Sequence, residues 1–215
     1  MPEFIIENMQ ISRGGRKLLR GLSFGLNSGE LLKLTGNNGV GKTSLMQILA
    51  GLSIPDQGDA RLNGVSLIED QAAYRDHIGY LGHQDNLKSD LTINENLSFW
   101  AHLYGGELAG GDAGRIPSLL TALGLNMRKD QRVSDLSVGL KRRTAIARLA
   151  LLDDKALWLM DEPLSGLDDE SRSAWAQIIT AYLDAGGMCI VSAHDDLPLS
   201  PSKQLKLDDY RAGSA

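Results

Sequence analysis

The residues best suited to chemistry form a glycine-rich run at positions 36–43, Gly-Asn-Asn-Gly-Val-Gly-Lys-Thr. This run fits the pattern G-x-x-x-x-G-K-[ST], in which glycines let backbone N–H groups approach phosphate oxygens closely. Lys42 would reach the β- and γ-phosphates, and Thr43 would place its hydroxyl on Mg²⁺. The sequence therefore predicts a nucleotide phosphate site formed by Gly36, Asn37, Asn38, Gly39, Val40, Gly41, Lys42, Thr43 and Ser44.

Two adjacent carboxylates, Asp161 and Glu162, follow the apolar run at 157–160 and would supply the other half of such a site. In an open α/β sheet, the carboxyl ends of the strands face the ligand crevice. Asp161 suits Mg²⁺ through an intervening water, because this ion keeps much of its hydration shell. Glu162 is placed to polarise an attacking water as a general base. Together with the phosphate loop, the pair predicts binding and hydrolysis of Mg-ATP.

These groups need elements that hold them at one edge of a sheet. The apolar residues at 31–34 predict a strand entering the phosphate loop, and the spacing at 44–52 predicts a helix leaving it. Further helices are expected at 94–104, 116–123, 137–152 and 168–185, and further strands at 4–6, 22–26, 156–160 and 188–192. This order predicts an α/β phosphate-loop NTPase core with a mainly parallel sheet, an N-terminal antiparallel β part and an inserted helical lobe.

One domain is expected over residues 1–215, with the helical lobe at approximately 90–150 within it. The segment 105–114 holds five glycines and is interpreted as a flexible connector inside the lobe. The polar tail after Asp208 is expected to be frayed.

Composition narrows the function classes. The net charge of −5 gives no global positive field, so nucleic acid is not expected as a partner. The short basic run at 141–143 is interpreted as the solvated face of a helix. The single cysteine, Cys189, suits a reducing compartment and is interpreted as a small buried hydrophobe. Since neither a signal peptide nor an apolar run of ~20 residues is found, we expect a cytoplasmic chain or one held at a membrane by a partner.

Other segments resemble the motifs of ABC ATPases. Residues 136–139 (Leu-Ser-Val-Gly) resemble the signature motif, and a basic helix follows them. Residues 165–168 (Ser-Gly-Leu-Asp) look like the D-loop. Gln84 lies where the Q-loop glutamine falls, and His194 follows a buried strand as the switch histidine does. The resemblance covers nearly the whole chain and implies the ABC ATPase fold.

By this resemblance, two copies of the chain face each other head to tail. Ser137 and Gly139 of one copy would contact the γ-phosphate held by Lys42 of the other, because a hydroxyl, an N–H and a helix N-terminus are all suited to an anion. Asp168 of the D-loop is counted among the nucleotide-binding residues.

The resemblance also assigns the remaining site residues. His194 would contact the γ-phosphate within its own chain and complete a catalytic set with Glu162 and Lys42. Gln84 would report the state of the nucleotide to a membrane partner. The implied metal set is Thr43, Gln84 and Asp161.

Two positions depart from the family pattern. Leu140 stands where glutamine usually follows the signature glycine, which removes a polar group near the expected dimer interface. Arg13 stands where an aromatic residue normally stacks on adenine. Since a guanidinium plane can stack on a base, our hypothesis is that Arg13 supplies this platform.

The segment 80–100 resembles the ATP-binding subunit of the bacterial cytochrome c maturation (haem export) system. It contains Gly-His-Gln at 82–84 and Leu-Thr-x-x-Glu-Asn-Leu-x-Phe at 91–99. This likeness implies integral membrane subunits of that system as partners, at the cytoplasmic face of the inner membrane. His83 invites interpretation as a haem ligand, but we favour a packing or loop-anchoring role, because it lies beside the Q-loop on the nucleotide side.

Two other functions are open at this point. The chain could serve an exporter of another substrate, or it could be a soluble ABC protein that does not transport. Soluble translation-type members usually carry two ATPase domains and repair members a long coiled coil, and the sequence has neither feature.

Overall fold

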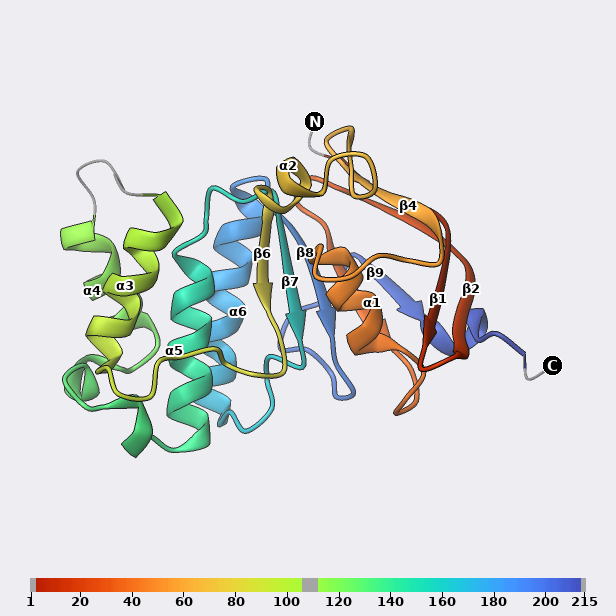
Figure 1. The fold of residues 1–215 in the computed structure, drawn as a ribbon. Coiled ribbons are helices and arrows are strands. Elements are labelled where there is room, and N and C mark those ends of the chain that lie inside the picture. Colours follow the sequence, from red (N-terminus) through yellow and green to blue (C-terminus); the bar gives the residue numbers. More distant parts are fainter. Residues whose placement is uncertain (1–2, 106–111, 214–215) are drawn as a thin grey trace.

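The computed structural model describes residues 3–105 and 112–213, and its strands form two sheets (Figure 1). An antiparallel sheet has the order β2-β1-β4-β5, and a parallel sheet has the order β6-β7-β8-β3-β9. The strands are β1 (Glu3–Arg13), β2 (Arg16–Asn27), β3 (Leu31–Thr35), β4 (Gln57–Leu62), β5 (Val65–Ser66), β6 (Ile78–Leu81), β7 (Leu157–Asp161), β8 (Met188–Ser192) and β9 (Lys203–Lys206). Both the parallel core and the N-terminal antiparallel part are thereby confirmed.

The helices cover the parallel sheet on both faces (Figure 1). They are α1 (Lys42–Leu49), α2 (Gln71–Arg75), α3 (Ile93–Gly105), α4 (Asp112–Ala122), α5 (Val138–Ala150) and α6 (Asp169–Asp184), with 3₁₀ helices at Asn126–Arg128, Val133–Asp135 and Leu207–Tyr210. In the part of the chain that is described, no helix has the length and apolar character to cross a bilayer.

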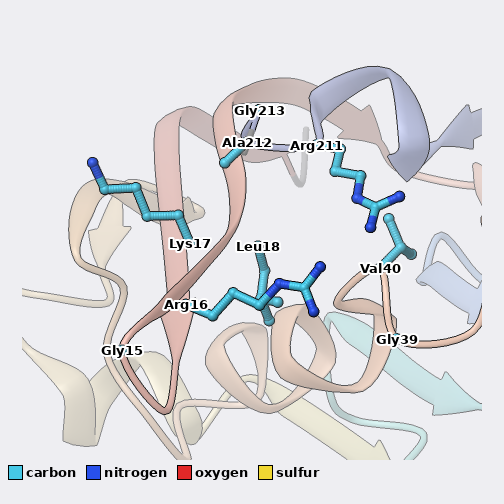
Figure 2. A pocket seen from close by; sticks show the side chains of 9 residues that line it. All are labelled: Gly15, Arg16, Lys17, Leu18, Gly39, Val40, Arg211, Ala212 and Gly213. Carbon is cyan, nitrogen blue, oxygen red and sulfur yellow. The ribbon is translucent and has the colours of Figure 1, made fainter. Parts of the chain in front are cut away.

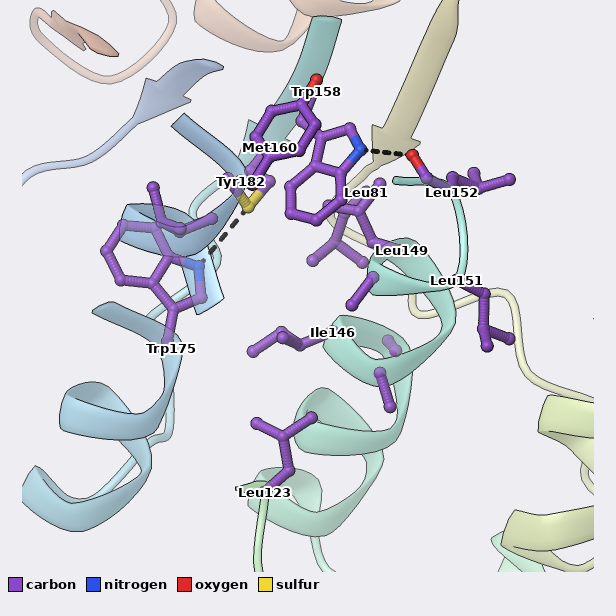
Figure 3. Close-up of a cluster of buried hydrophobic side chains, with 14 of the residues drawn as sticks. Leu81, Leu123, Ile146, Leu149, Leu151, Leu152, Trp158, Met160, Trp175 and Tyr182 are labelled. Carbon is purple, nitrogen blue, oxygen red and sulfur yellow. Dashed lines mark hydrogen bonds between the residues drawn. The ribbon is translucent and has the colours of Figure 1, made fainter. Parts of the chain in front are cut away.

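The parallel sheet divides the hydrophobic core in two, because alternate residues of a buried strand face opposite sides. Leu157 and Leu159 of β7 face the α1 side, whereas Trp158 and Met160 face α5 and α6. Figure 3 shows the second side, where the Trp175 indole of α6 donates to the Met160 sulfur at 3.4 Å. Cys189 of β8 is fully buried there, and burial raises the pKa of its thiol. The interpretation of this cysteine as a small buried hydrophobe is confirmed.

The helical insertion is built by α3, α4 and the outer face of α5 (Figure 1). It begins with a capping box, in which Thr92 N–H donates to Glu95 and Glu95 N–H donates to the Thr92 hydroxyl. The buried Asn96 amide bonds the carbonyls of Lys88, Leu91 and Thr92. The Leu-Thr-x-x-Glu-Asn motif thus has a structural role at this helix start. Most of the expected connector at 105–114 lies outside the described residues.

The C-terminal segment differs from the expected frayed tail. Residues Leu207–Tyr210 form a 3₁₀ helix, and Leu207 is fully buried. Beyond it, Arg211 pairs with Leu19 of β2, and the Ala212 N–H donates to the Leu18 carbonyl at 3.0 Å. The expectation was wrong because it was made from polar composition, whereas Leu207 and these backbone hydrogen bonds attach the segment to β2.

Candidate nucleotide site

The phosphate loop connects the end of β3 to the start of α1, as its sequence requires. Gly36, Gly39 and Gly41 have φ angles of 149°, 78° and 121°, which favour glycine. A Cβ atom at Gly36 would lie 2.9 Å from the Val40 side chain and 3.1 Å from Asp208. The loop therefore needs glycine at this position for space as well as for backbone conformation.

Three ionisable side chains that were predicted to be catalytic converge at this loop. The Lys42 Nζ donates to the Gly36 carbonyl at 2.7 Å and lies 3.2 Å from His194 Nε2. The same His194 nitrogen is 3.3 Å from Glu162 Oε1. Since Nε2 either accepts from Lys42 or donates to Glu162, the proton on His194 decides which contact is a hydrogen bond. A side chain at the start of α1 thus meets two side chains from the residues that directly follow β7 and β8.

Two of the three residues expected to hold Mg²⁺, Thr43 and Asp161, are in contact. Thr43 Oγ1 donates to Asp161 Oδ2 at 2.8 Å, and the Ser192 hydroxyl donates to the other carboxylate oxygen. Asp161 is buried, and Tyr80 nearby has its pKa raised to about 12, first by burial and then by the charge of Asp161. A hydroxyl beside a buried carboxylate fits a hard cation that prefers oxygen ligands. The residues present therefore fit Mg²⁺ at Thr43 and Asp161.

Glu162 has an unusual backbone conformation. Its φ angle is 51°, in the left-handed region that costs a residue other than glycine about 1–3 kcal/mol. The Glu162 N–H donates to the carbonyl and the hydroxyl of Ser192, at 3.1 and 3.0 Å. These contacts from β8 hold the residue in place, so the direction of its carboxylate is set by the neighbouring strand. No sequence pattern identified Ser192.

Gln84 lies at the same edge of the sheet as these groups, because β6 and β7 are parallel neighbours with Leu81 opposite Met160. Its side chain is exposed, and within the described residues it makes no hydrogen bond with Thr43 or Asp161. The neighbouring His83 is exposed as well, which disfavours a packing role, and the loop-anchoring role stays a prediction. The structure thus places Gln84 near the predicted metal set without joining it.

Arg13 borders the hollow above the phosphate loop, which has a volume of about 320 Å³. It ends β1 and is paired with Arg16 across the Gly14–Gly15 turn. The hollow is lined by Arg13, Leu18, Asn38, Gly39, Gly41, Lys42, Thr43, Ser44 and Glu162. A second hollow of about 720 Å³ adjoins it at Leu18 and Gly39, with Arg16 and Arg211 on its walls (Figure 2). Arg13 is thus brought to the predicted nucleotide site.

The signature residues lie elsewhere, at the N-terminus of α5. Ser137 is the N-cap, and its hydroxyl accepts from the Leu140 N–H at 3.3 Å. A Cβ atom at Gly139 would lie 2.9 Å from the Gly166 carbonyl, so the signature and D-loop segments touch. Leu140 is half-buried against the core, which gives the departure from glutamine a packing explanation. Neither Ser137 nor Gly139 lines the hollow around Lys42.

Asp168 caps the next helix. Its carboxylate accepts from the Ser171 N–H at 2.9 Å at the start of α6, and this hydrogen bonding holds the pKa of Asp168 below its usual range. The side chain is exposed and does not line the hollow around Lys42. Within this chain, Asp168 therefore has a structural role.

The basic run at 141–143 is not a solvated helix face. Arg142 is 5% exposed, and its guanidinium donates to carbonyls at the end of β7. The expectation was wrong because helical periodicity alone did not reveal that this side of α5 packs on the loops after β6 and β7. Arg143 is half-buried and donates to the Leu123 carbonyl at 3.2 Å.

Asp208 is a second residue that the sequence did not indicate. Its carboxylate accepts from the Asn37 N–H at 3.1 Å and from the Asn37 side-chain amide at 2.8 Å. The C-terminal 3₁₀ helix therefore holds the first turn of the phosphate loop. The only signal available in the sequence was the acidic pair at 208–209, which resembles many exposed acidic pairs.

Replacement of Asp208 by alanine is expected to raise the KM for ATP by about 3- to 10-fold, because hydrogen bonds to a carboxylate in a partly exposed site contribute about 1 kcal/mol. The kcat should change less than the KM, since Lys42 and Glu162 keep their own contacts. Steady-state kinetics of Asp208→Ala and of Asp209→Ala, whose side chain is exposed, would measure this. An equal KM in both variants would contradict the anchoring role.

A phosphate loop, an oxygen donor pair and a histidine–glutamate contact on a parallel sheet define a phosphate-loop nucleotide-binding protein. The comparisons with known proteins narrow this class. Residues 19–165 match the family model described as ABC transporter. The chain therefore belongs to the ABC transporter family, as an ATP-binding subunit with the ABC ATPase fold.

Individual relatives agree with this assignment. The chain is 40% identical over 208 residues to the cytochrome c biogenesis ATP-binding export protein CcmA of Paramagnetospirillum magneticum, covering 96% of this chain and 94% of that protein. It is 38% identical over 207 residues to the protein of the same name from Paracoccus denitrificans, covering 96% of this chain and 90% of that protein.

Solved structures show the same fold. A structure described as the ATP-binding subunit of an ABC transporter superposes with a TM-score of 0.81 at 27% identity, over 89% of this chain and 79% of that one. An ABC transporter ATP-binding protein from Pyrococcus furiosus superposes with a TM-score of 0.84 at 20% identity, over 98% of this chain and 100% of that one. At this low identity, the likeness supports only the fold.

Proposed function

We propose that this chain hydrolyses Mg-ATP as one ATPase domain over residues 1–215. The observation that carries the proposal is the convergence of Lys42, His194 and Glu162, with 3.2 and 3.3 Å contacts, beside the Thr43–Asp161 pair. When bound, Mg²⁺ would supply a positive charge that offsets the charge of the phosphates. Thr43 and Asp161 would hold it, and Gln84 would become a third ligand after moving toward the ion.

The reaction then depends on positions of protein groups. Lys42 would donate to the β- and γ-phosphates in place of the Gly36 carbonyl it contacts here. Glu162 would accept a proton from, or polarise, the attacking water. His194, which already lies beside both residues, would contact the γ-phosphate and hold this geometry. The phosphate loop from Gly36 to Ser44 would bind the remaining oxygens.

A second copy of the chain completes the site in this proposal. The N-terminus of α5 presents the exposed Ser137 and the half-buried Gly139, whose donors suit an anion, yet neither residue lines the hollow around Lys42. A head-to-tail dimer would bring them to the γ-phosphate of the other copy, with Asp168 beside the interface. Hydrolysis should therefore rise faster than linearly with protein concentration in the dilute range.

Membrane subunits are the proposed partners, at the cytoplasmic face of the inner membrane. Phe99 and Leu103 lie one turn apart on α3 and are 38% and 61% exposed. Exposed apolar side chains on a helix suit contact with another protein. Gln84 lies on the segment that leads toward this helix, so it could respond to such a contact.

The substrate that we propose is haem for cytochrome c assembly. The proposal rests on the CcmA relatives, which match this chain over nearly their full lengths. Deletion of the gene should abolish c-type cytochromes, as detected by haem staining, and wild-type chain but not Glu162→Gln should restore them. Normal c-type cytochromes in the deletion strain, with loss of another exported compound, would instead favour the exporter of another substrate.

The proposed role of Arg13 as the adenine platform can be tested separately. Arg13→Ala should lower the affinity for ATP by about two- to fivefold, since cation–π contacts at exposed sites contribute about 0.5–1 kcal/mol. The affinity for tripolyphosphate, which has no base, should not change. Calorimetric titration of both ligands measures this, with Arg13→Trp expected to restore ATP binding. An unchanged ATP affinity in Arg13→Ala would contradict the hypothesis.

A further inference from the structure

The buried side chain of Arg142 joins two segments at the edge of the sheet where the site lies, residues 161–163 and residues 82–85, and we call it the Arg142 junction. A guanidinium has five N–H donors, and each of them has an acceptor here. Nε donates to the Pro163 carbonyl at 3.1 Å, and Nη2 donates to the carbonyls of Asp161 and Glu162 at 2.8 and 2.9 Å. Nη1 donates to the Gly82 carbonyl and to the Asp85 carboxylate, both at 3.0 Å.

One side of this junction holds the backbone that carries Glu162. Three consecutive carbonyls, from Asp161 to Pro163, accept from Arg142. On the other side of the same peptide, the Glu162 N–H is bonded to Ser192. Glu162 keeps its positive φ angle between these two attachments. A left-handed conformation of this kind persists only where the surrounding contacts hold it. Loss of Arg142 should therefore allow the backbone of Glu162 to leave this conformation.

The other side of the junction holds the segment that follows β6. Gly82 and Asp85 flank Gln84, which is exposed. The ion pair between Asp85 and Arg142 is shielded, with side-chain exposures of 24% and 6%. Because the guanidinium is planar and rigid, a shift of this segment must either move the group or break its contacts. Movement of the group would in turn displace the carbonyls beside Glu162.

We propose that Arg142 is a positioning residue that couples the Gly82–Asp85 segment to the backbone of Glu162. A partner protein that displaces this segment would thereby change the position of the carboxylate and the rate of hydrolysis. The inference rests on the proposed function for the role of Glu162, but the contacts that transmit the displacement lie wholly within this chain. Lysine could not replace Arg142, because a single ammonium with three donors cannot reach acceptors on both segments.

The first test is kinetic. In the full chain, Arg142→Lys should lower kcat by about 10- to 100-fold, because a misplacement of the order of 1 Å can have an effect of about 10²-fold. The KM for ATP should stay within about twofold, since all five donors of Arg142 bind acceptors outside the phosphate loop, and its one indirect link to the loop runs through Asp161 to Thr43. Arg143→Lys is the matched control on the same helix, and it should keep the wild-type kcat. A wild-type kcat in Arg142→Lys would overturn the proposal.

The second test detects coupling even where Arg142→Lys does not fold. Asp85→Ala leaves the contacts with Asp161, Glu162 and Pro163 in place. Coupling predicts faster amide hydrogen exchange in this variant at 162–165 as well as at 82–86. If exchange changed only at 82–86, the two segments would be anchored independently and the proposal would be wrong. The proposed function has its own test. It would be wrong if the wild-type chain did not hydrolyse ATP, or if Glu162→Gln hydrolysed ATP as fast as wild type. The exchange experiment would still show whether the two segments are coupled.

Discussion

Replacement of Glu162 by glutamine is expected to lower the kcat for ATP hydrolysis by about 10²–10⁴-fold, the usual contribution of a general base. The amide keeps the size of the side chain and can still contact His194, but it cannot take a proton. The N–H and carbonyl of residue 162 would keep their bonds to Ser192 and Arg142. ATP should therefore still bind, and an ATP-bound dimer should accumulate.

Size-exclusion chromatography with ATP and Mg²⁺ would detect this dimer, and phosphate release would measure kcat. Glu170→Gln is a suitable control, because Glu170 is an exposed glutamate in the first turn of α6. It should hydrolyse ATP at the wild-type rate and should not accumulate as a dimer. Hydrolysis at more than a tenth of the wild-type rate in Glu162→Gln would exclude Glu162 as the general base.

Replacement of Lys42 by alanine is expected to abolish measurable hydrolysis. Lys42 is 7% exposed, and its ammonium lies between the Gly36 carbonyl and His194, which places it at the centre of the loop. Charge-assisted hydrogen bonds contribute about 1.5–3 kcal/mol each, so two bonds to phosphate oxygens correspond to a loss of about 10²–10⁴-fold in kcat/KM. Unlike Glu162→Gln, this variant should also bind ATP weakly and should not form the trapped dimer.

The control for Lys42→Ala is Lys129→Ala, which removes the same charge from an exposed position beside the 3₁₀ helix at Asn126–Arg128. Thermal unfolding of both variants separates a loss of catalysis from a loss of folded protein. ATP affinity by calorimetry then distinguishes the role of Lys42 from that of Glu162. Tight ATP binding with normal turnover in Lys42→Ala would be incompatible with phosphate contact by this residue.

The local parts of this protein were readable from its sequence. The glycine pattern at 36–43 predicted the phosphate loop, because only glycine tolerates the φ angles that the loop has at Gly36 and Gly41. Continuous apolar runs predicted β7 and β8, since strands covered on both faces have no polar alternation. Helical spacing predicted the cores of α1, α3, α5 and α6.

Errors arose where a polar residue acquires its role from a distant segment. The sequence predicts that Arg142 lies on a solvated helix face, yet its acceptors at Asp161 and Gly82 are 19 and 60 residues away in the chain. No role is predicted for Asp208, which precedes the tail expected to be frayed, and its partner Asn37 is 171 residues away. Such contacts exist only after the strands have come together in the order β6-β7-β8-β3-β9.

The sequence by itself determined the phosphate loop, the paired carboxylates and the family, because each depends on residue types within a short stretch. Only the tertiary structure decided which groups surround Glu162, since Ser192 and His194 come from the end of β8 and the residues after it, and Arg142 comes from α5. It also separated Ser137 and Gly139 from the hollow around Lys42. The physical reason is that a hydrogen bond requires donor and acceptor within about 3 Å, and for distant segments that proximity depends on the packing of the sheet and its helices.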